Sequence, residues 1–285
     1  MRLPFKIRNP SLLDELVPYV VATPFNLLQL NLNPFGVPTL PEHVIDPLRL
    51  DSETFLTLLQ RLDGLTFGPE GMPMPRWVFY DCAELPGAIY GLARPAQTLW
   101  PRARDLFRVP DDYQGLVPVS MYVAIPMPKA GMWFGHNLSS LAPVFEQEQV
   151  TELDLRGLGS LTKGLALKAF QVQEFWGATQ WLSKALYIHV KFGPLSLSTA
   201  WTPAHSEAET LTYGFRVTDE ALRASMGDPT VTLARPAPDF WLDGHDQKGM
   251  IALQDRIEAG ERFVIPESPR PVAEGGVRVP ITRVA

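Results

Sequence analysis

The chain has 285 residues, of which 46% are hydrophobic and 20% charged, with a formal net charge of −6. This length suffices to bury a large core, and the composition is that of an ordinary globular protein. No basic block is interleaved with aromatic residues, which argues against nucleic acid as a partner. No stretch approaches the roughly 20 apolar residues of a membrane helix. The N-terminal charges and prolines do not fit a signal peptide, so we expect a cytoplasmic protein that does not engage a membrane.

The sequence gives no sign of a metal site or of a common hydrolase motif. A single cysteine, Cys82, excludes an internal disulfide and a cysteine metal cluster. Histidine and acidic residues do not recur at metal-ligand spacing, and the Gly-x-Ser-x-Gly turn of serine hydrolases does not occur. We therefore expect no metal and no cofactor, and a small molecule as the ligand. The sequence leaves open whether the chain forms a homo-oligomer.

Proline, at 28 residues, is about twice as frequent as in an average protein. Because proline is poorly tolerated inside helices, it favours short elements and turns. Residues 1–50 are expected to form an N-terminal wrapping segment with one short helix near residues 11–21. Residues 51–265 form the main domain, and residues 266–285 an extended C-terminal segment.

The first half of the main domain mixes helical and strand-like patterns. A helix is predicted from Asp51 to Gly64, with Phe55, Leu58 and Leu62 on its apolar face. The other predicted elements are a hairpin over 77–95 that turns at 85–87 and buries Cys82, a helix over 98–110, and strands over 116–126 and 131–141.

The second half begins with the longest predicted helix, over 159–177, where Gly177 suits the position just past a helix end. Residues 185–192 and 195–202 alternate on either side of Gly193, which predicts a hairpin. A strand over 210–217 and a helix over 218–227 follow. No regular βαβ alternation appears, so we expect an α+β domain. Its curved antiparallel sheet would close into a cone or barrel, with flanking helices.

The block from Leu161 to Trp201 resembles the acetoacetate decarboxylase-like superfamily. Glu174, Trp176 and Gly177 match that family's helix end, and Gly193 matches the glycine of its strand pair. The resemblance implies a cavity for a small organic acid or ketone, and either a Schiff-base lyase or a non-catalytic binder.

The family's lysine pair falls on Gln180 and Trp181, which cannot form a Schiff base. An insertion of residues 178–181 would bring Lys184 to that position instead, at the head of an apolar strand face where burial would lower its pKa. The resemblance thus implies Lys184 as the catalytic lysine, with His136 assisting proton transfer. The side chains expected to line the cavity are Trp133, Asn137, Glu174, Trp176, Gln180 and Trp181.

A second resemblance is to the GCN5-related N-acyltransferases. The family's pyrophosphate turn resembles the run that starts at Arg156 with Gly159, or the run that ends at Gly164, Leu165 and Ala166. In the first register Leu161 stands where glycine or alanine belongs, and in the second it stands where arginine belongs. The run from Ser183 to Gly193 is similar to a later helix of the family. This resemblance implies acetyl-coenzyme A as the acyl donor, held by amides at a helix N-terminus. The alternation of residues 185–192 and the short spacing before them favour the decarboxylase-like interpretation.

Overall fold

The computed structural model describes residues 2–71, 73–78, 81, 87–150, 154–272 and 276–284. Within them, twelve strands join in one mixed sheet whose order is β11-β12-β10-β7-β8-β6-β5-β4-β3-β1-β2, with β9 paired to β12. The strands β1 and β2 pair in parallel, as do β5 and β6, whereas the other strand pairs that the structure describes are antiparallel. The α+β class is therefore confirmed. The sheet is open between β11 and β2 and does not close into a barrel.

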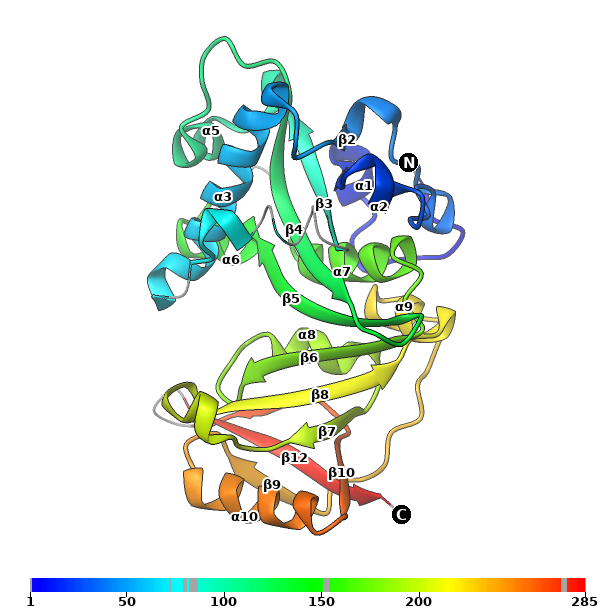
Figure 1. Cartoon of the computed structure of the whole chain (residues 1–285), viewed down its shortest axis with the longest axis vertical. Coiled ribbons are helices and arrows are strands. Elements are labelled where there is room, and N and C mark those ends of the chain that lie inside the picture. Colours follow the sequence, from blue (N-terminus) through cyan, green and yellow to red (C-terminus); the bar gives the residue numbers. More distant parts are fainter. Residues whose placement is uncertain are drawn as a thin grey trace.

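The upper half of the molecule in Figure 1 holds the N-terminal elements. Their bounds are α1 Leu12–Glu15, β1 Val17–Val21, α2 Pro24–Leu27, β2 Val44–Ile45, α3 Glu53–Phe67, β3 Ala88–Pro95, α5 Pro101–Phe107, β4 Leu116–Pro126, β5 Met132–Ser140, α6 Leu141–Gln147 and α7 Leu158–Ala169.

The lower half holds the C-terminal elements. Their bounds are β6 Glu174–Gln180, α8 Leu186–His189, the 3-10 turn η6 Val190–Phe192, β7 Leu195–Thr199, β8 Thr210–Arg216, α9 Asp219–Ser225, β9 Phe240–Asp243, α10 Gln247–Glu258, β10 Arg262–Ile265, β11 Arg270–Pro271 and β12 Val277–Val284.

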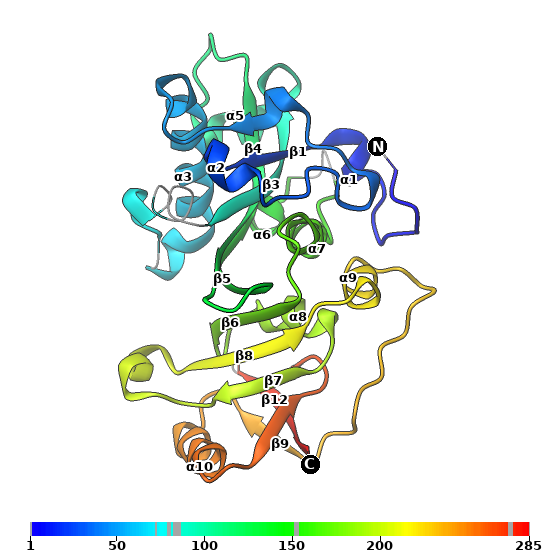
Figure 2. The same ribbon diagram turned by 45° about the vertical axis from the view of Figure 1, so that its right-hand side comes forward.

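Helices cover both faces of the sheet around β4. Helix α3 packs on β4 and β5 from one side, and α7 packs on β3, β4 and β5 from the other, with α9 beside it (Figure 2). Residues 117–124 of β4 are consequently all buried, as expected for a strand covered on both faces. Helix α7 is itself enclosed, with residues 158–167 and 169 buried, so it forms the centre of the core.

Several predicted elements are confirmed. Helix α3 buries Phe55, Leu58 and Leu62 as predicted, although it continues past Gly64 to Phe67. Helix α5 and the strands β4, β5 and β8 fall within their predicted ranges. Helix α9 begins at the predicted position, where the Thr218 side chain accepts a hydrogen bond from the Ala221 N–H.

Two predictions in the second half are wrong. The helix expected over 159–177 ends at Ala169, and Glu174 already begins β6, so Gly177 lies inside a strand. Residues 186–192, expected as the first strand of a hairpin, are helical in α8 and η6. Their buried residues follow helical spacing, because Leu186, His189 and Val190 all face the core.

The hairpin predicted over 77–95 is also wrong at its start, since residues 76–78 are helical. The second half of that hairpin corresponds to β3. Cys82 and the turn at residues 85 and 86 lie outside the described part of the chain.

Candidate functional site

The parallel strands β5 and β6 pair over only four residue pairs, from Met132–Glu174 to Gly135–Gly177. Beyond these glycines, β5 continues against β4 and β6 continues against β8. Figure 1 shows the two ribbons together at the right and diverging toward the left. The strands separate at a β-bulge, because Val123 pairs with Asn137 and Ala124 with Gly135, which leaves His136 as the extra residue.

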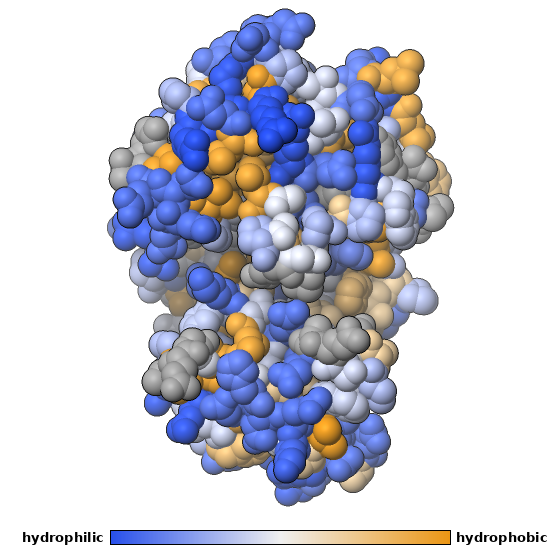
Figure 3. Space-filling model, turned by 90° about the vertical axis from the view of Figure 1, so that its left-hand side faces the viewer, coloured by the Kyte–Doolittle hydropathy of each residue, from blue (hydrophilic) through white to orange (hydrophobic). Residues whose placement is uncertain are grey.

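A cavity of about 460 Å³ fills the space between the separated strands. We call it the β5–β6 cleft. The surface of the molecule is indented at this level, as Figure 3 shows from the side on which the strands separate. The described residues around the cleft combine apolar side chains with a similar number of polar ones, so the cleft offers both a hydrophobic surface and hydrogen-bonding groups to a small molecule. Those used below are Met74, Tyr122, His136, Asn137, Leu138, Phe175, Gln180, His189 and Tyr213.

Two glycines make room for two phenol groups where the strands separate. A Cβ atom on Gly135 would collide with the Tyr122 hydroxyl, and one on Gly177 would lie 2.9 Å from the Tyr213 hydroxyl. Burial raises the pKa of both tyrosines well above the ordinary value. Both phenols are therefore neutral hydrogen-bond donors at the cleft.

Lys163 lies in the core directly behind the cleft wall. It is fully buried in the second turn of α7, and its Nζ lies 2.8 Å from Nδ1 of His189, which lines the cleft. None of the ion pairs between described residues includes it. Five aromatic rings surround its Nζ, with centroids 4.1 to 6.0 Å away: Phe175, Phe192, Phe215, Tyr122 and Tyr213.

Burial lowers the pKa of Lys163 well below its ordinary value. The pKa of His189 is also lowered, first by burial and then by the charge of Lys163. A positive charge on Lys163 thus disfavours a second positive charge on His189. Because the two groups are buried and lie 2.8 Å apart, the pair carries at most one positive charge.

A second polar network fixes the other wall of the cleft. Asp63 of α3 is fully buried and accepts hydrogen bonds from the Asn137 amide, the Ser139 hydroxyl and the Met74 backbone N–H. Burial raises the pKa of Asp63, and these hydrogen bonds partly offset the rise. The network holds the Asn137 side chain in place at the rim.

The N-terminus of α7 carries an excess of positive charge. Gly157 precedes the helix with φ +89°, and the Lys191 ammonium donates to the Ser160 hydroxyl at 3.0 Å. Burial, and then the charge of Arg8, lower the pKa of Lys191. Arg156 is paired with Asp154 at 2.6 Å, so this one carboxylate balances only one of the three cations around it.

This terminus adjoins the cleft. A Cβ atom on Gly159 would lie 3.3 Å from the Ile188 side chain and 3.8 Å from that of Leu138, a residue of the cleft wall.

The residues that the sequence singled out fall in different places. His136, Asn137 and Gln180 line the cleft. Glu174 and Trp176 line a separate cavity of about 540 Å³, where Glu174 pairs with Lys129 at 2.9 Å.

The other three predicted residues are not part of the described lining of either cavity. Trp133 is buried and stacks on Phe170. Trp181 is fully buried and donates its Nε1–H to the Ala200 carbonyl. Lys184 is exposed in a turn, so the expectation that it lies buried on a strand face is wrong.

The sequence analysis missed Lys163, His189, Tyr122 and Tyr213 as site residues. One signal was present, since Lys163 is the only charged residue between positions 157 and 167 in an otherwise apolar helix. A charge at the centre of a helix that is apolar on every side must be buried.

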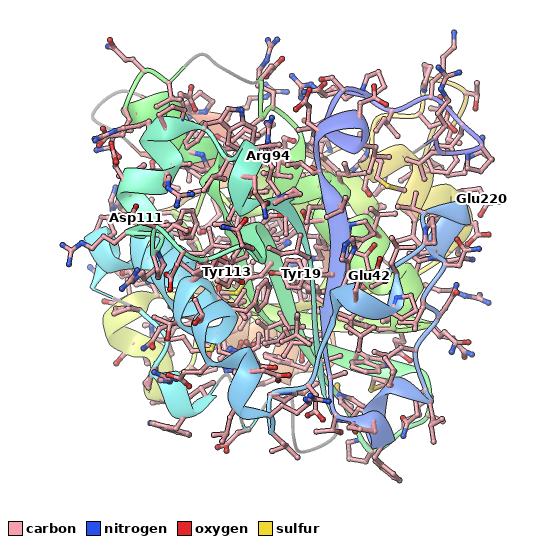
Figure 4. The ribbon with its side chains drawn as sticks, turned by 90° about the horizontal axis from the view of Figure 1, so that it is seen from above. Tyr19, Glu42, Arg94, Asp111, Tyr113 and Glu220 are labelled. Carbon is pink, nitrogen blue, oxygen red and sulfur yellow. The ribbon has the colours of Figure 1, made fainter. Side chains whose placement is uncertain are left out.

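A larger cavity of about 970 Å³ lies at the upper end of the molecule. Figure 4 looks onto this end, where Glu42 and Tyr113 come from the N-terminal segment and the loop before β4. We take the β5–β6 cleft as the candidate site because polar groups from β4, β5, β8 and α8 converge there.

No family model matches the chain, and no curated protein is significantly similar to it. Among the residues that the structure describes, no helix is long and apolar enough to cross a membrane. The same residues contain no group of three or more histidine, cysteine or acidic side chains arranged to hold a metal ion.

Proposed function

We propose that the chain is an acyltransferase that binds an acyl thioester of coenzyme A in the β5–β6 cleft and transfers the acyl group to an amine. The observation that carries the proposal is the order helix α7, strand β6, helix α8 between Leu158 and Gly193. The resemblance to the N-acyltransferases requires this order, with a phosphate-binding turn before the first helix. The sequence analysis counted the short spacing before residue 185 against an acyltransferase. The structure accommodates a strand and a helix in this spacing, because β6 starts early, at Glu174, and the second helix is short.

The N-terminus of α7 supplies the anion-binding end of such a site. Free amides and the helix dipole favour a phosphate at a helix N-terminus. Lys191 and Arg8 add two cations beyond the Arg156–Asp154 pair. A Cβ atom on Gly159 would lie 3.8 Å from the Leu138 side chain, so this terminus lies beside the second half of β5, near the carboxyl end of that strand. Ligands commonly bind at the carboxyl ends of parallel strands.

The cleft supplies the part of the site that would hold the acyl group. A cavity of about 460 Å³ is large enough for an acyl group and part of the chain that carries it. The apolar part of its lining suits the acyl chain, and the neutral hydroxyls of Tyr122 and Tyr213 are donors that would stabilise an oxyanion.

Carbonyl condensation on a lysine is the second candidate, and one observation favours it. Lys163 is a buried amine of lowered pKa beside the cleft, which Schiff-base chemistry needs. Against it, Lys163 is fully buried and is not part of the described cleft lining. Borohydride reduction with acetoacetate distinguishes the two, because only condensation leaves a stable adduct on Lys163.

The test of the proposal is calorimetric titration with coenzyme A. We expect micromolar binding to the full chain. Lys191→Ala should weaken binding about tenfold or more, as expected for one charge-assisted hydrogen bond. The matched control is Lys184→Ala, an exposed lysine seven residues earlier, which should leave binding unchanged. No binding, or equal losses in the two variants, would overturn the proposal.

A further inference from the structure

We propose that His189 is the catalytic base of this transfer, and that Lys163 is a positioning residue that sets the tautomer of His189 and accepts its second proton. The inference rests on the proposed function for the reaction, and on the buried pair for the roles. It assigns a proton path from the cleft into the core of the protein.

The hydrogen bond decides which nitrogen of His189 is available. Nδ1 is engaged with the Nζ of Lys163 at 2.8 Å, which leaves Nε2 as the ring nitrogen for a substrate in the cleft. If Lys163 is an uncharged amine, it accepts the Nδ1–H hydrogen bond. Nε2 then carries a lone pair and acts as a base. A charged Lys163 would instead donate to Nδ1 and place a proton on Nε2, where the ring could not act as a base.

The surroundings favour the uncharged amine at rest. Lys163 is fully buried and forms no ion pair with any described residue, and an unpaired ammonium in such a place is costly. Among the described residues, the titratable groups whose rings lie around its Nζ are the phenols of Tyr122 and Tyr213, in addition to His189. Burial keeps these phenols neutral, so they neither compensate the charge nor take up the proton.

The same surroundings tolerate a transient charge. Aromatic rings attract a cation to their faces within about 6 Å, by roughly 0.5–2 kcal/mol each. The Nζ of Lys163 lies 4.1 Å from the ring of Phe175, 5.0 Å from that of Phe192 and 5.3 Å from that of Phe215. Lys163 therefore receives a proton briefly more easily than its burial alone suggests.

The reaction step balances as follows. The amine nitrogen of the acceptor attacks the thioester carbonyl carbon, forming the C–N bond, and Nε2 of His189 takes the N–H proton. The Nδ1 proton of His189 passes to Nζ of Lys163. The C–S bond then breaks and its electron pair leaves with the sulfur. The proton returns through His189 to the thiolate, so the products are an amide and free coenzyme A.

The first test is the protonation of the His189 ring in the full chain labelled with ¹⁵N-histidine. The chain has five histidines, and His189→Gln identifies the resonances of His189. At neutral pH we expect the Nδ1–H tautomer in the wild type. In Lys163→Met the amine is replaced by an apolar side chain of similar length, and the ring should change to the Nε2–H tautomer or to a mixture. A wild-type ring that carries its proton on Nε2 would overturn the inference.

The second test is acyl transfer from acetyl-coenzyme A to a panel of primary amines. We expect Lys163→Met to lower kcat about a hundredfold or more with little change in KM, in the range of lost acid–base catalysis. The low-pH limb of its rate profile should move to lower pH, because an uncharged Lys163 that accepts the Nδ1–H stabilises the protonated ring and methionine cannot do so.

The matched control is Lys168→Met, on the same helix but ion-paired to Asp219 at the surface, which should retain wild-type kcat. Equal loss in both variants would contradict a special role for Lys163.

The two tests separate this inference from the proposed function. If coenzyme A does not bind but the wild-type ring shows the expected tautomer, the acyltransferase proposal fails and the coupled pair stands. If coenzyme A binds but the tautomer is the other one, the base is not His189.

Discussion

Lys163 lies at a buried position where an amine lowers the stability of the fold. Its neighbours in α7 are buried on every side, and an apolar residue there would avoid the cost of burying an amine. A buried group whose pKa is shifted well away from its ordinary value is most often found at a functional site. Lys184, in contrast, is exposed in a turn and bears no such cost, so a lysine that matches a motif by position alone need not be the reactive one.

We predict that Lys163→Met stabilises the fold, and that the gain depends on pH. The pKa of Lys163 is lowered in the folded chain, so between that pKa and the ordinary value of about 10.4 the unfolded chain binds one more proton. In this range the wild-type free energy of unfolding rises by about 1.4 kcal/mol per pH unit as pH increases. The variant lacks this dependence, so its advantage is largest at the low end of this range and shrinks as the pH approaches the ordinary pKa of lysine.

Urea denaturation of both proteins at several pH values between about 7 and 10 checks the prediction. Lys168→Met is again the control, and it should show no such trend. An advantage of Lys163→Met that is constant with pH would contradict an uncharged lysine in the core.

At the scale of single elements, α8 shows why alternation misled the sequence analysis. Residues 186–192 contain β-branched and aromatic side chains in a period-two pattern, which normally indicates a strand. Contacts with other parts of the chain stabilise a helical conformation instead. The Ser183 side chain accepts a hydrogen bond from the Ala185 N–H, and Arg235 donates to the Val190 carbonyl at 2.7 Å. The contact from Arg235 comes from 45 residues further along the chain, and local patterns do not reveal it.

Other elements could be predicted because their signals are local. The apolar face of α3 and the Thr218 cap of α9 are both readable from neighbouring residues. The cleft was only partly predictable. His136, predicted as catalytic, and Asn137 and Gln180, predicted as ligand-binding, line the cleft. Lys163 and His189 are 26 positions apart in the chain and belong to two different helices. One of these helices had been predicted as a strand.

The turn that ends η6 gives a test of this helical assignment. Gly193 has φ +131° and ψ −175°, a region that is essentially restricted to glycine. Gly193→Ala should therefore lower the free energy of unfolding by about 1–3 kcal/mol, although no atom lies closer than 4.0 Å to the added methyl group.

The control for this turn is Gly64→Ala, within helix α3, where no neighbouring atom lies within 4 Å of an added Cβ. This change should raise stability by about 0.5–1 kcal/mol, because alanine is the better helix former. Chemical denaturation of the two variants measures both effects. A neutral Gly193→Ala would mean that residues 190–193 do not form this turn.

At the scale of the whole molecule, a short ladder joins the two halves of the sheet. The β5–β6 ladder is the strand pairing that joins β1–β5 to β6–β12 in the described sheet, and it contains only four residue pairs. The cleft lies directly beside these pairs, with its walls on opposite halves of the sheet. A ligand between the walls contacts both halves, so its binding should be coupled to local opening of the ladder.

This coupling predicts where a bound thioester protects the backbone. With acetyl-coenzyme A at about 100 times its Kd, openings that require ligand release become about 100-fold rarer, because exchange slows by the factor 1 + [L]/Kd. We expect slower amide exchange over residues 136–138 and 178–180, on the two sides of the cleft. The amides of α10, in the distal part of the lower half (Figure 1), should exchange at unchanged rates. Hydrogen-exchange mass spectrometry resolves these segments. Protection confined to residues around Lys129 and Trp176 would place the ligand in the other cavity, and a cleft with unchanged exchange would exclude it as the thioester site.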